Sequence, residues 1–162
     1  MFKKNNSIET STFSQIPRVT SITIPEGITD LGSYGINDCS NLVSIKLPES
    51  LKSAGYDAFS YNSKLKSIIL PDNLKFGGLA FRQCSSLEEV KLPANLTKIP
   101  YHSFSGCSKL KHIDIPAGVT IVEYNAFDYS GIQSLVLPEG ITSLPNSLCA
   151  SCSSLQSVTI PK

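Results

Sequence analysis

The side chains in this sequence that are best suited to nucleophilic, redox or metal chemistry are its five cysteines and two histidines. Cys149 and Cys152 form a C-x-x-C pair, a spacing found in thiol redox sites and in metal sites. However, Cys39, Cys84, Cys107 and Cys152 all lie nine residues before a recurring proline. Such regular placement favours a small, inward-facing core residue. We therefore expect five free, mostly buried thiols, with a Cys84–Cys107 disulfide and a metal or redox role for Cys149 and Cys152 as alternatives.

The two histidines do not indicate a catalytic site. We expect His102 in an exposed turn and His112 on the exposed side of a strand, with no Ser-His-Asp or Cys-His arrangement in a shared repeat. Paired carboxylates, a glycine-rich phosphate loop and a His/Asp/Glu cluster at metal-ligand spacing are also absent from the sequence. We therefore predict that the chain is not an enzyme and binds no metal or cofactor.

Charge and hydropathy exclude two classes of partner. The 162 residues include 14 Lys and Arg against 13 Asp and Glu, a formal net charge of +1 without a block of one sign. This balance gives no electrostatic basis for binding nucleic acid or an anionic membrane. No apolar run approaches the ~20 residues of a membrane span. We predict no nucleic-acid binding and no membrane insertion by this segment.

A short repeat organises the whole sequence. Its most regular feature is a proline at seven positions: Pro25, Pro48, Pro71, Pro93, Pro116, Pro138 and Pro161. Apolar residues recur six, three and one residues before each proline, and a mostly aromatic anchor lies about midway between successive prolines. Self-similarity at a fixed period is the sequence signature of a solenoid. We predict a single domain over residues 1–162 with about 6.5 repeats.

Short strands are expected directly before the prolines. The segment Ser44–Leu47 alternates polar and apolar side chains, which is typical of a half-buried strand, and the proline that follows ends it. We expect one parallel sheet and little or no helix, with strands centred near Ile22–Ile24, Ile45–Leu47, Ile68–Leu70, Val90–Leu92, Ile113–Ile115, Leu135–Leu137 and Val158–Ile160. The anchors should form a buried stack opposite this sheet: Phe59, Phe81, Phe104 and Phe127.

The repeat L-x-x-I-x-L-P, followed by A-F-x-x-C, resembles the BspA-like leucine-rich-repeat family. The most typical stretches are Lys64–Pro71 and Ser103–Pro116, and the resemblance extends from about Asn6 to Pro161. It implies a right-handed, curved leucine-rich-repeat solenoid, mainly β, with short parallel strands on the concave face and loops or short turns on the convex side. The asparagine of the general leucine-rich-repeat pattern is missing after the strand, so we expect no asparagine ladder.

The resemblance also implies a non-enzymatic protein–protein interaction or adhesion module, part of a microbial surface or secreted protein. The start of the chain has no signal peptide, so a cytoplasmic location stays open as the alternative. The runner-up function is a structural array or spacer that assembles end to end or within a larger protein. The protein ligand would come from a host or be a second copy of the chain.

Two surfaces are candidates for ligand contact. The first is the exposed strand face, with these central residues: Ser67, Ile69, Glu89, Lys91, His112, Asp114, Ser134 and Val136. Ile69 and Val136 are apolar where water is expected, whereas the charged residues have pairing across strands as an alternative role, for example Lys91 with Asp114. The second surface consists of Tyr56, Tyr101 and Tyr124 at one repeat position, since tyrosine is enriched at interfaces. Covering a loop edge is the alternative there.

The two ends of the chain carry a further expectation. The sequence begins inside a partial repeat whose outer side is polar: Lys3, Lys4, Asn5 and Asn6. It stops directly after the strand Ser157–Ile160, and the open edge of a strand is a template for another chain. We expect this C-terminal edge to be covered by further repeats, by a partner or by an end-to-end neighbour.

Overall fold

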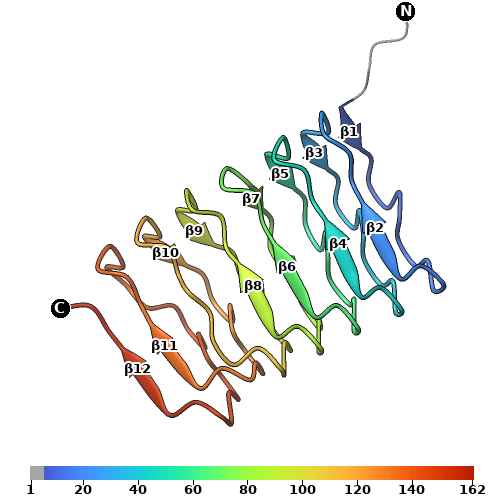
Figure 1. Cartoon of the computed structure of the whole chain (residues 1–162). Coiled ribbons are helices and arrows are strands. Elements are labelled where there is room, and N and C mark those ends of the chain that lie inside the picture. The colour runs from blue at the N-terminus through green and yellow to red at the C-terminus, as the bar shows by residue number, and fades with distance from the viewer. Residues whose placement is uncertain (1–5) are drawn as a thin grey trace, which may run out of the picture.

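The computed structural model describes residues 6–162, which form a continuous coil of stacked rungs (Figure 1). The expectation about Lys3, Lys4 and Asn5 lies outside these residues. We number the rungs 1 to 7 by the proline that ends each of them, from Pro25 to Pro161. Every regular element in residues 6–162 is a short strand, and this part of the chain holds no helix that could cross a membrane. The predicted solenoid class is confirmed.

One row of strands precedes the prolines, and we call it the proline-side row. It consists of β2 (Ser21–Thr23), β4 (Ser44–Lys46), β6 (Ser67–Ile69), β8 (Glu89–Lys91), β11 (Ser134–Val136) and β12 (Ser157–Thr159). Six of the seven predicted strands are therefore confirmed, each beginning one residue earlier than expected. The strand predicted at Ile113–Ile115 is wrong, because rung 5 has no regular element there. The single sheet is also wrong, since the row divides into three parallel pairs: β2–β4, β6–β8 and β11–β12.

A second row lies before the anchors, and we call it the anchor-side row (Figure 1). It consists of β1 (Ser7–Ile8), β3 (Asp30–Leu31), β5 (Ser53–Ala54), β7 (Lys75–Phe76), β9 (Lys98–Ile99) and β10 (Ile121–Val122). The strands β1, β3, β5 and β7 form one parallel sheet, and β9 pairs with β10. The second residue of each of these strands is buried, except Ile8 in β1, which is half-buried, and we did not predict these strands from the sequence. Two residues are too few to show a period of two.

The residue after each anchor-side strand decides whether this row continues. In rung 3 it is Gly55, whose N–H donates to the carbonyl oxygen of Leu31 at 2.8 Å. A Cβ on Gly55 would lie 2.5 Å from the backbone nitrogen of Ser33, so glycine permits the close approach of the two rungs. Pro100 and Pro145 hold this position in rungs 5 and 7 and have no N–H to donate. The row is interrupted before both prolines.

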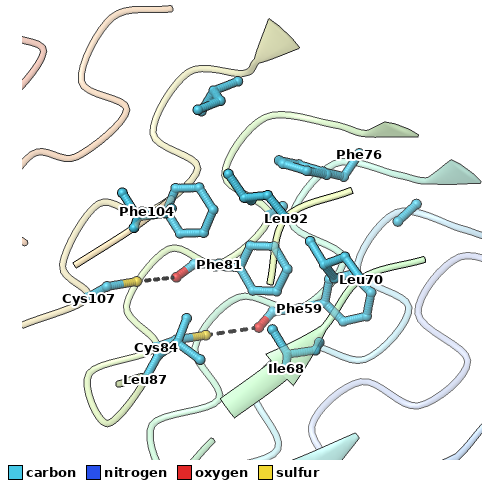
Figure 2. Close-up of a cluster of buried hydrophobic side chains, with 14 of the residues drawn as sticks. Phe59, Ile68, Leu70, Phe76, Phe81, Cys84, Leu87, Leu92, Phe104 and Cys107 are labelled. Carbon is cyan, nitrogen blue, oxygen red and sulfur yellow. Dashed lines mark hydrogen bonds between the residues drawn. The ribbon is translucent and has the colours of Figure 1, made fainter. Parts of the chain in front are cut away.

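The anchors form the centre of the core. Phe59, Phe81, Phe104 and Phe127 are 0% exposed. Their ring centroids are 5.2, 5.4 and 5.7 Å apart along the chain, with ring planes within 9° of parallel. Figure 2 shows the first three of these rings. The predicted buried stack is confirmed. Each ring covers the next, so a rung in isolation would leave both faces of its anchor uncovered.

The cysteine position adds a hydrogen bond between rungs. The Cys84 thiol donates to the carbonyl oxygen of Phe59 at 3.2 Å (Figure 2). Asn62 holds the same position in rung 3, and its side-chain amide donates to the carbonyl oxygen of Ile36 at 2.8 Å. The thiol bond recurs at Cys39, Cys107 and Cys152. Thiols and one asparagine thus bond rungs 1 to 5 in succession and rung 6 to rung 7. In rung 6 the position is held by Ser130, whose hydroxyl lies 3.4 Å from the Cys152 sulfur.

The anchor segments contain left-handed backbone at two places in each rung, two residues before and two residues after the anchor. Thirteen non-glycine residues have φ between 51° and 63°, and they all lie at these two positions. Only Gly106 supplies glycine there. Each anchor is therefore held between two backbone reversals that direct its side chain into the core.

Candidate interaction surface

The solvent side of the proline-side row carries the first predicted ligand face. Seven of its eight predicted residues are exposed, and Ser134 is half-buried. Ile69 and Val136 are 66% and 62% exposed, more than any other large aliphatic side chain in the described part of the chain. A partner that covered these two side chains would gain free energy by removing their apolar area from water.

The centre of this face is open because rung 5 has no strand. None of the backbone N–H groups of residues 112–115 is bonded to a backbone carbonyl within residues 6–162. A hollow of about 780 Å³ lies on one side of this segment, lined by residues that include Glu88, Glu89, Lys111 and His112. A second hollow, of about 600 Å³, lies between rung 5 and β11. The predicted face is therefore centred on unpaired backbone as well as on charged side chains.

The charged side chains at this centre do not pair with one another. The one ion pair in residues 6–162 joins Lys98 to Glu123, with a nitrogen–oxygen distance of 2.9 Å, and it lies on the anchor-side row. The alternative pairing of Lys91 with Asp114 is absent from this part of the chain. These charges are left to water or to a partner.

His112 is oriented by its neighbour in rung 6. Its Nδ1 lies 3.3 Å from the hydroxyl oxygen of Ser134, while Nε2 has no hydrogen-bond partner among the described residues. The prediction that His112 is exposed is confirmed. The contact with Ser134 thus restrains the exposed imidazole through one of its two ring nitrogens.

The predicted tyrosine surface is a packed strip. The rings of Tyr101 and Tyr124 stack with centroids 5.3 Å apart and planes at 10°. Tyr56 lies 6.4 Å from Tyr101 although rung 4 separates them. Gly78 takes the tyrosine position in rung 4, and a Cβ on it would lie 2.4 Å from the Tyr101 ring. The missing side chain therefore lets Tyr101 lean across to Tyr56.

Two further residues of this strip were not identified from the sequence. Tyr34 makes an edge contact with Tyr56 at 5.6 Å, and it lies one residue away from the tyrosine position of the other rungs. His102, which we expected to be exposed, is half-buried and meets the edge of the Tyr124 ring at 5.6 Å. These rings pack against one another, while Tyr34, Tyr56 and Tyr124 are still 37%, 36% and 49% exposed.

The cysteines are poorly placed for chemistry. The structure holds all five as free thiols, with Cys39, Cys84 and Cys107 buried and Cys149 and Cys152 half-buried. Burial raises the pKa of Cys84 and of Cys149 to about 12, so the reactive thiolate is scarce near neutral pH. In residues 6–162, no three His, Cys, Asp or Glu side chains gather closely enough to hold a metal ion.

Comparisons with known proteins agree with this architecture. A sequence profile of the BspA-type leucine-rich repeat region matches residues 1–78 and 75–162, in six copies. No curated protein sequence matches the chain.

Several solved structures share the fold. A leucine-rich repeat protein of T. pallidum is 29% identical, with a TM-score of 0.83, over 88% of this chain and 71% of that one. A leucine-rich repeat protein of Bacteroides ovatus is 26% identical, with a TM-score of 0.59, over 95% of this chain and 52% of that one. A leucine-rich cell surface protein of Faecalibacterium prausnitzii is 18% identical, with a TM-score of 0.50, over 93% of this chain and 62% of that one. The chain therefore spans between about half and 71% of the length of these relatives.

Proposed function

Because this chain belongs to the BspA-type leucine-rich repeat family, we propose that it is a non-enzymatic module that recognises a protein through its proline-side strand face. The observation that carries the proposal is the centre of that face. There, unpaired backbone, unpaired charges and two exposed aliphatic side chains lie together on neighbouring rungs. We further propose that the module works at a cell surface or outside the cell, as the description of the F. prausnitzii protein as a cell surface protein suggests.

The chemistry of the face suits a protein partner. Ile69 and Val136 supply apolar area at its two sides, and the charged residues between them supply orientation through complementary partners. The tyrosine strip is less suited, because Tyr101 and Tyr124 already cover one another's ring faces. We therefore assign recognition to the strand face and a mainly structural role to the strip.

A structural array is the second candidate function. Val158 of β12 and the neighbouring Ile160 are both exposed, so this edge can seat a further rung, a partner or a neighbouring molecule. If stacking through β12 is the main role, then Val158→Lys should abolish an association seen by light scattering. The strand-face variants described next should leave that association intact.

The proposal is tested by matched variants on an array of purified extracellular proteins. One variant carries Ile69→Ser and Val136→Ser on the strand face, and its control carries Ile121→Ser, an aliphatic side chain that is 51% exposed on the anchor-side row. We expect the wild type and the Ile121 control to bind the same proteins and the strand-face variant to lose them. Binding that survives in the strand-face variant but is lost in Tyr101→Ser would assign recognition to the tyrosine strip and contradict the proposal.

A further inference from the structure

The residues on the solvent side of the strand face, from rung 3 to rung 6, complement their own reverse order along the solenoid. Four residues before the proline, rungs 2 to 7 carry Ser44, Ser67, Glu89, His112, Ser134 and Ser157. Two residues before the proline, they carry Lys46, Ile69, Lys91, Asp114, Val136 and Thr159. When each series is compared with its own reverse, serine meets serine, Ile69 meets Val136, and each of the four central residues meets one of complementary type. The outermost pair, Lys46 with Thr159, is the one that does not match. The midpoint of both series lies between rungs 4 and 5.

We propose that this face binds a second copy of itself about a two-fold axis that runs parallel to the strands and passes between rungs 4 and 5. This rotation reverses the order of the rungs and keeps the direction of the strands. Lys91 therefore faces Asp114 of the partner subunit, and Glu89 faces His112 of the partner subunit. Ile69 packs on Val136 of the partner subunit. The inference rests on the proposed function of this face and names its partner.

A two-fold interface needs a self-complementary patch, and each contact in it occurs twice. Lys91, Asp114 and Glu89 form no ion pair with any residue in 6–162, so pairing across the axis breaks nothing within the subunit. His112 is held through Nδ1 by Ser134, which leaves Nε2 available to meet Glu89 of the partner subunit. The two aliphatic side chains would lose their contact with water in the same event.

A different axis, parallel to the solenoid, would also bring opposite charges together, since it sets Lys91 against Glu89 of the partner subunit. It would, however, place Ile69 against Ser67 of the partner subunit and leave both exposed aliphatic residues without an apolar contact. The axis parallel to the strands matches charge and hydropathy at the same time. The face is narrow, so the buried area should fall below roughly 1,200 Å² and the dimer should be weak and reversible.

Sedimentation equilibrium over a concentration series tests the proposal. The wild type should dimerise with a Kd on the order of 10–100 µM, as a small interface predicts. Lys91→Asp and Asp114→Lys should each weaken the dimer by about tenfold or more, because each brings like charges together. The double variant should recover to within about threefold of the wild type. Lys75→Asp, a charge reversal on the anchor-side row, should have no effect, and circular dichroism should show that every variant is folded.

A wild type that stays monomeric throughout the series overturns the proposal. A double variant that is no better than the single variants also overturns it, because the pairing of residues 91 and 114 would then be wrong. The protein array separates this failure from failure of the proposed function. If the wild type is monomeric but Ile69→Ser with Val136→Ser still loses array partners, recognition by the face stands and only self-pairing is refuted. If the array partners are retained as well, both proposals are refuted.

Discussion

At the scale of single residues, each anchor phenylalanine stabilises two neighbouring rungs, because its ring is covered on both faces. Phe104 stacks between Phe81 and Phe127 and is 0% exposed. We expect Phe104→Ala to lower the free energy of unfolding by about 3–5 kcal/mol, since it leaves a cavity that cannot fully collapse. Urea titration measures the loss, and Phe104→Leu, which keeps more of the volume, is the control that should lose less. A loss below about 1 kcal/mol for the alanine variant would contradict the buried stack.

The buried thiols predict a dependence of stability on pH. Burial raises the pKa of Cys84 from 9.0 to about 12, so the folded state favours the neutral thiol. Its contribution is fully present below about pH 9 and is lost as the pH rises toward 12, because the unfolded chain ionises first. Cys84→Ser keeps a donor for the carbonyl of Phe59 but does not titrate in this range.

Relative to Cys84→Ser, the wild type should lose up to about 1.4 kcal/mol of unfolding free energy per pH unit above about pH 9. Urea titrations under reducing conditions between about pH 8 and 11 compare the two slopes. Parallel slopes would show that the Cys84 thiol is not buried in the neutral form.

Residue roles differ in how visible they are in the sequence. The anchors and the buried cysteines were predictable because an aromatic or thiol recurs at a fixed place in each repeat. The left-handed positions were not, because they are filled by unlike residues such as Tyr34, Leu79 and Gln83. Glycine, the usual signal for positive φ, occurs at only one of these positions, Gly106. At Tyr34, Leu79 and Gln83 local preference does not favour this conformation, so it is imposed there by the stacking of rungs.

At the scale of elements, the anchor-side row shows how one residue controls a ladder. Pro100→Gly supplies the missing N–H, which should donate to the carbonyl of Phe76 as the N–H of Gly77 donates to Ala54 at 3.0 Å. We expect β7 and β9 to join, and the exchange of the amide at position 100 to slow by about tenfold or more. The extra freedom of the unfolded chain should cost up to about 1 kcal/mol. Hydrogen exchange followed by NMR measures the protection.

Pro100→Ala provides the matched control. Alanine also has an N–H, and a residue with a Cβ can donate from this position, because the N–H of Glu123 in rung 6 bonds to the carbonyl oxygen of Ile99 at 2.9 Å. We therefore expect protection with both glycine and alanine. Protection with glycine alone would show that a Cβ keeps rungs 4 and 5 apart, and no protection in either variant would show that Pro100 is not the cause of the interruption.

The strands themselves were predictable to the extent that their side chains alternate. The proline-side row was predicted in six rungs because three residues with one buried between two exposed give a readable pattern. The same pattern in rung 5 misled us, since Ile113 is buried and its neighbours are exposed although no strand forms. Periodicity reports which side chains face the core, whereas a ladder also needs the neighbouring backbone at hydrogen-bonding distance.

At the scale of the whole molecule, the backbone hydrogen bonds between rungs in residues 6–162 join residues about one repeat apart. Deleting residues 38–60, which removes one whole repeat, joins Asn37 to Tyr61 and keeps both at their repeat positions. We expect this shorter chain to fold, with a denaturant m-value lower by roughly one seventh, because one rung less of surface is exposed on unfolding. The control deletes only residues 38–57 and so shifts the anchor out of phase. A control that folds as well as the in-phase deletion would show that the repeat register does not determine the fold.

The candidate face was predictable in its members but not in its geometry. The exposed positions followed from the repeat, so Glu89, Lys91, His112 and Asp114 were identified together. The absence of ion pairs among these four side chains was not predictable. Residues at the same repeat position are expected on neighbouring strands, close enough for their side chains to pair. The place of Tyr34 in the tyrosine strip was not predictable either, because Tyr34 lies one residue away from the tyrosine position of the other rungs.

The junction between rungs 4 and 5 has a mechanical consequence. It lacks ladder bonds in both strand rows, and its backbone bonds lie in the anchor segments, such as Phe81 N–H to Ser103 O at 2.9 Å, and in the turn where Asn95 N–H meets Asp72 O at 3.0 Å. Tension applied to the two ends acts on every junction between rungs in series. The junction between rungs 4 and 5 should extend first, because it has the fewest backbone hydrogen bonds between its rungs. The solenoid should therefore hinge there on its anchor side, and tension should widen the centre of the strand face before any rung unravels. Tension along the solenoid would therefore act directly on a protein bound at the centre of the strand face.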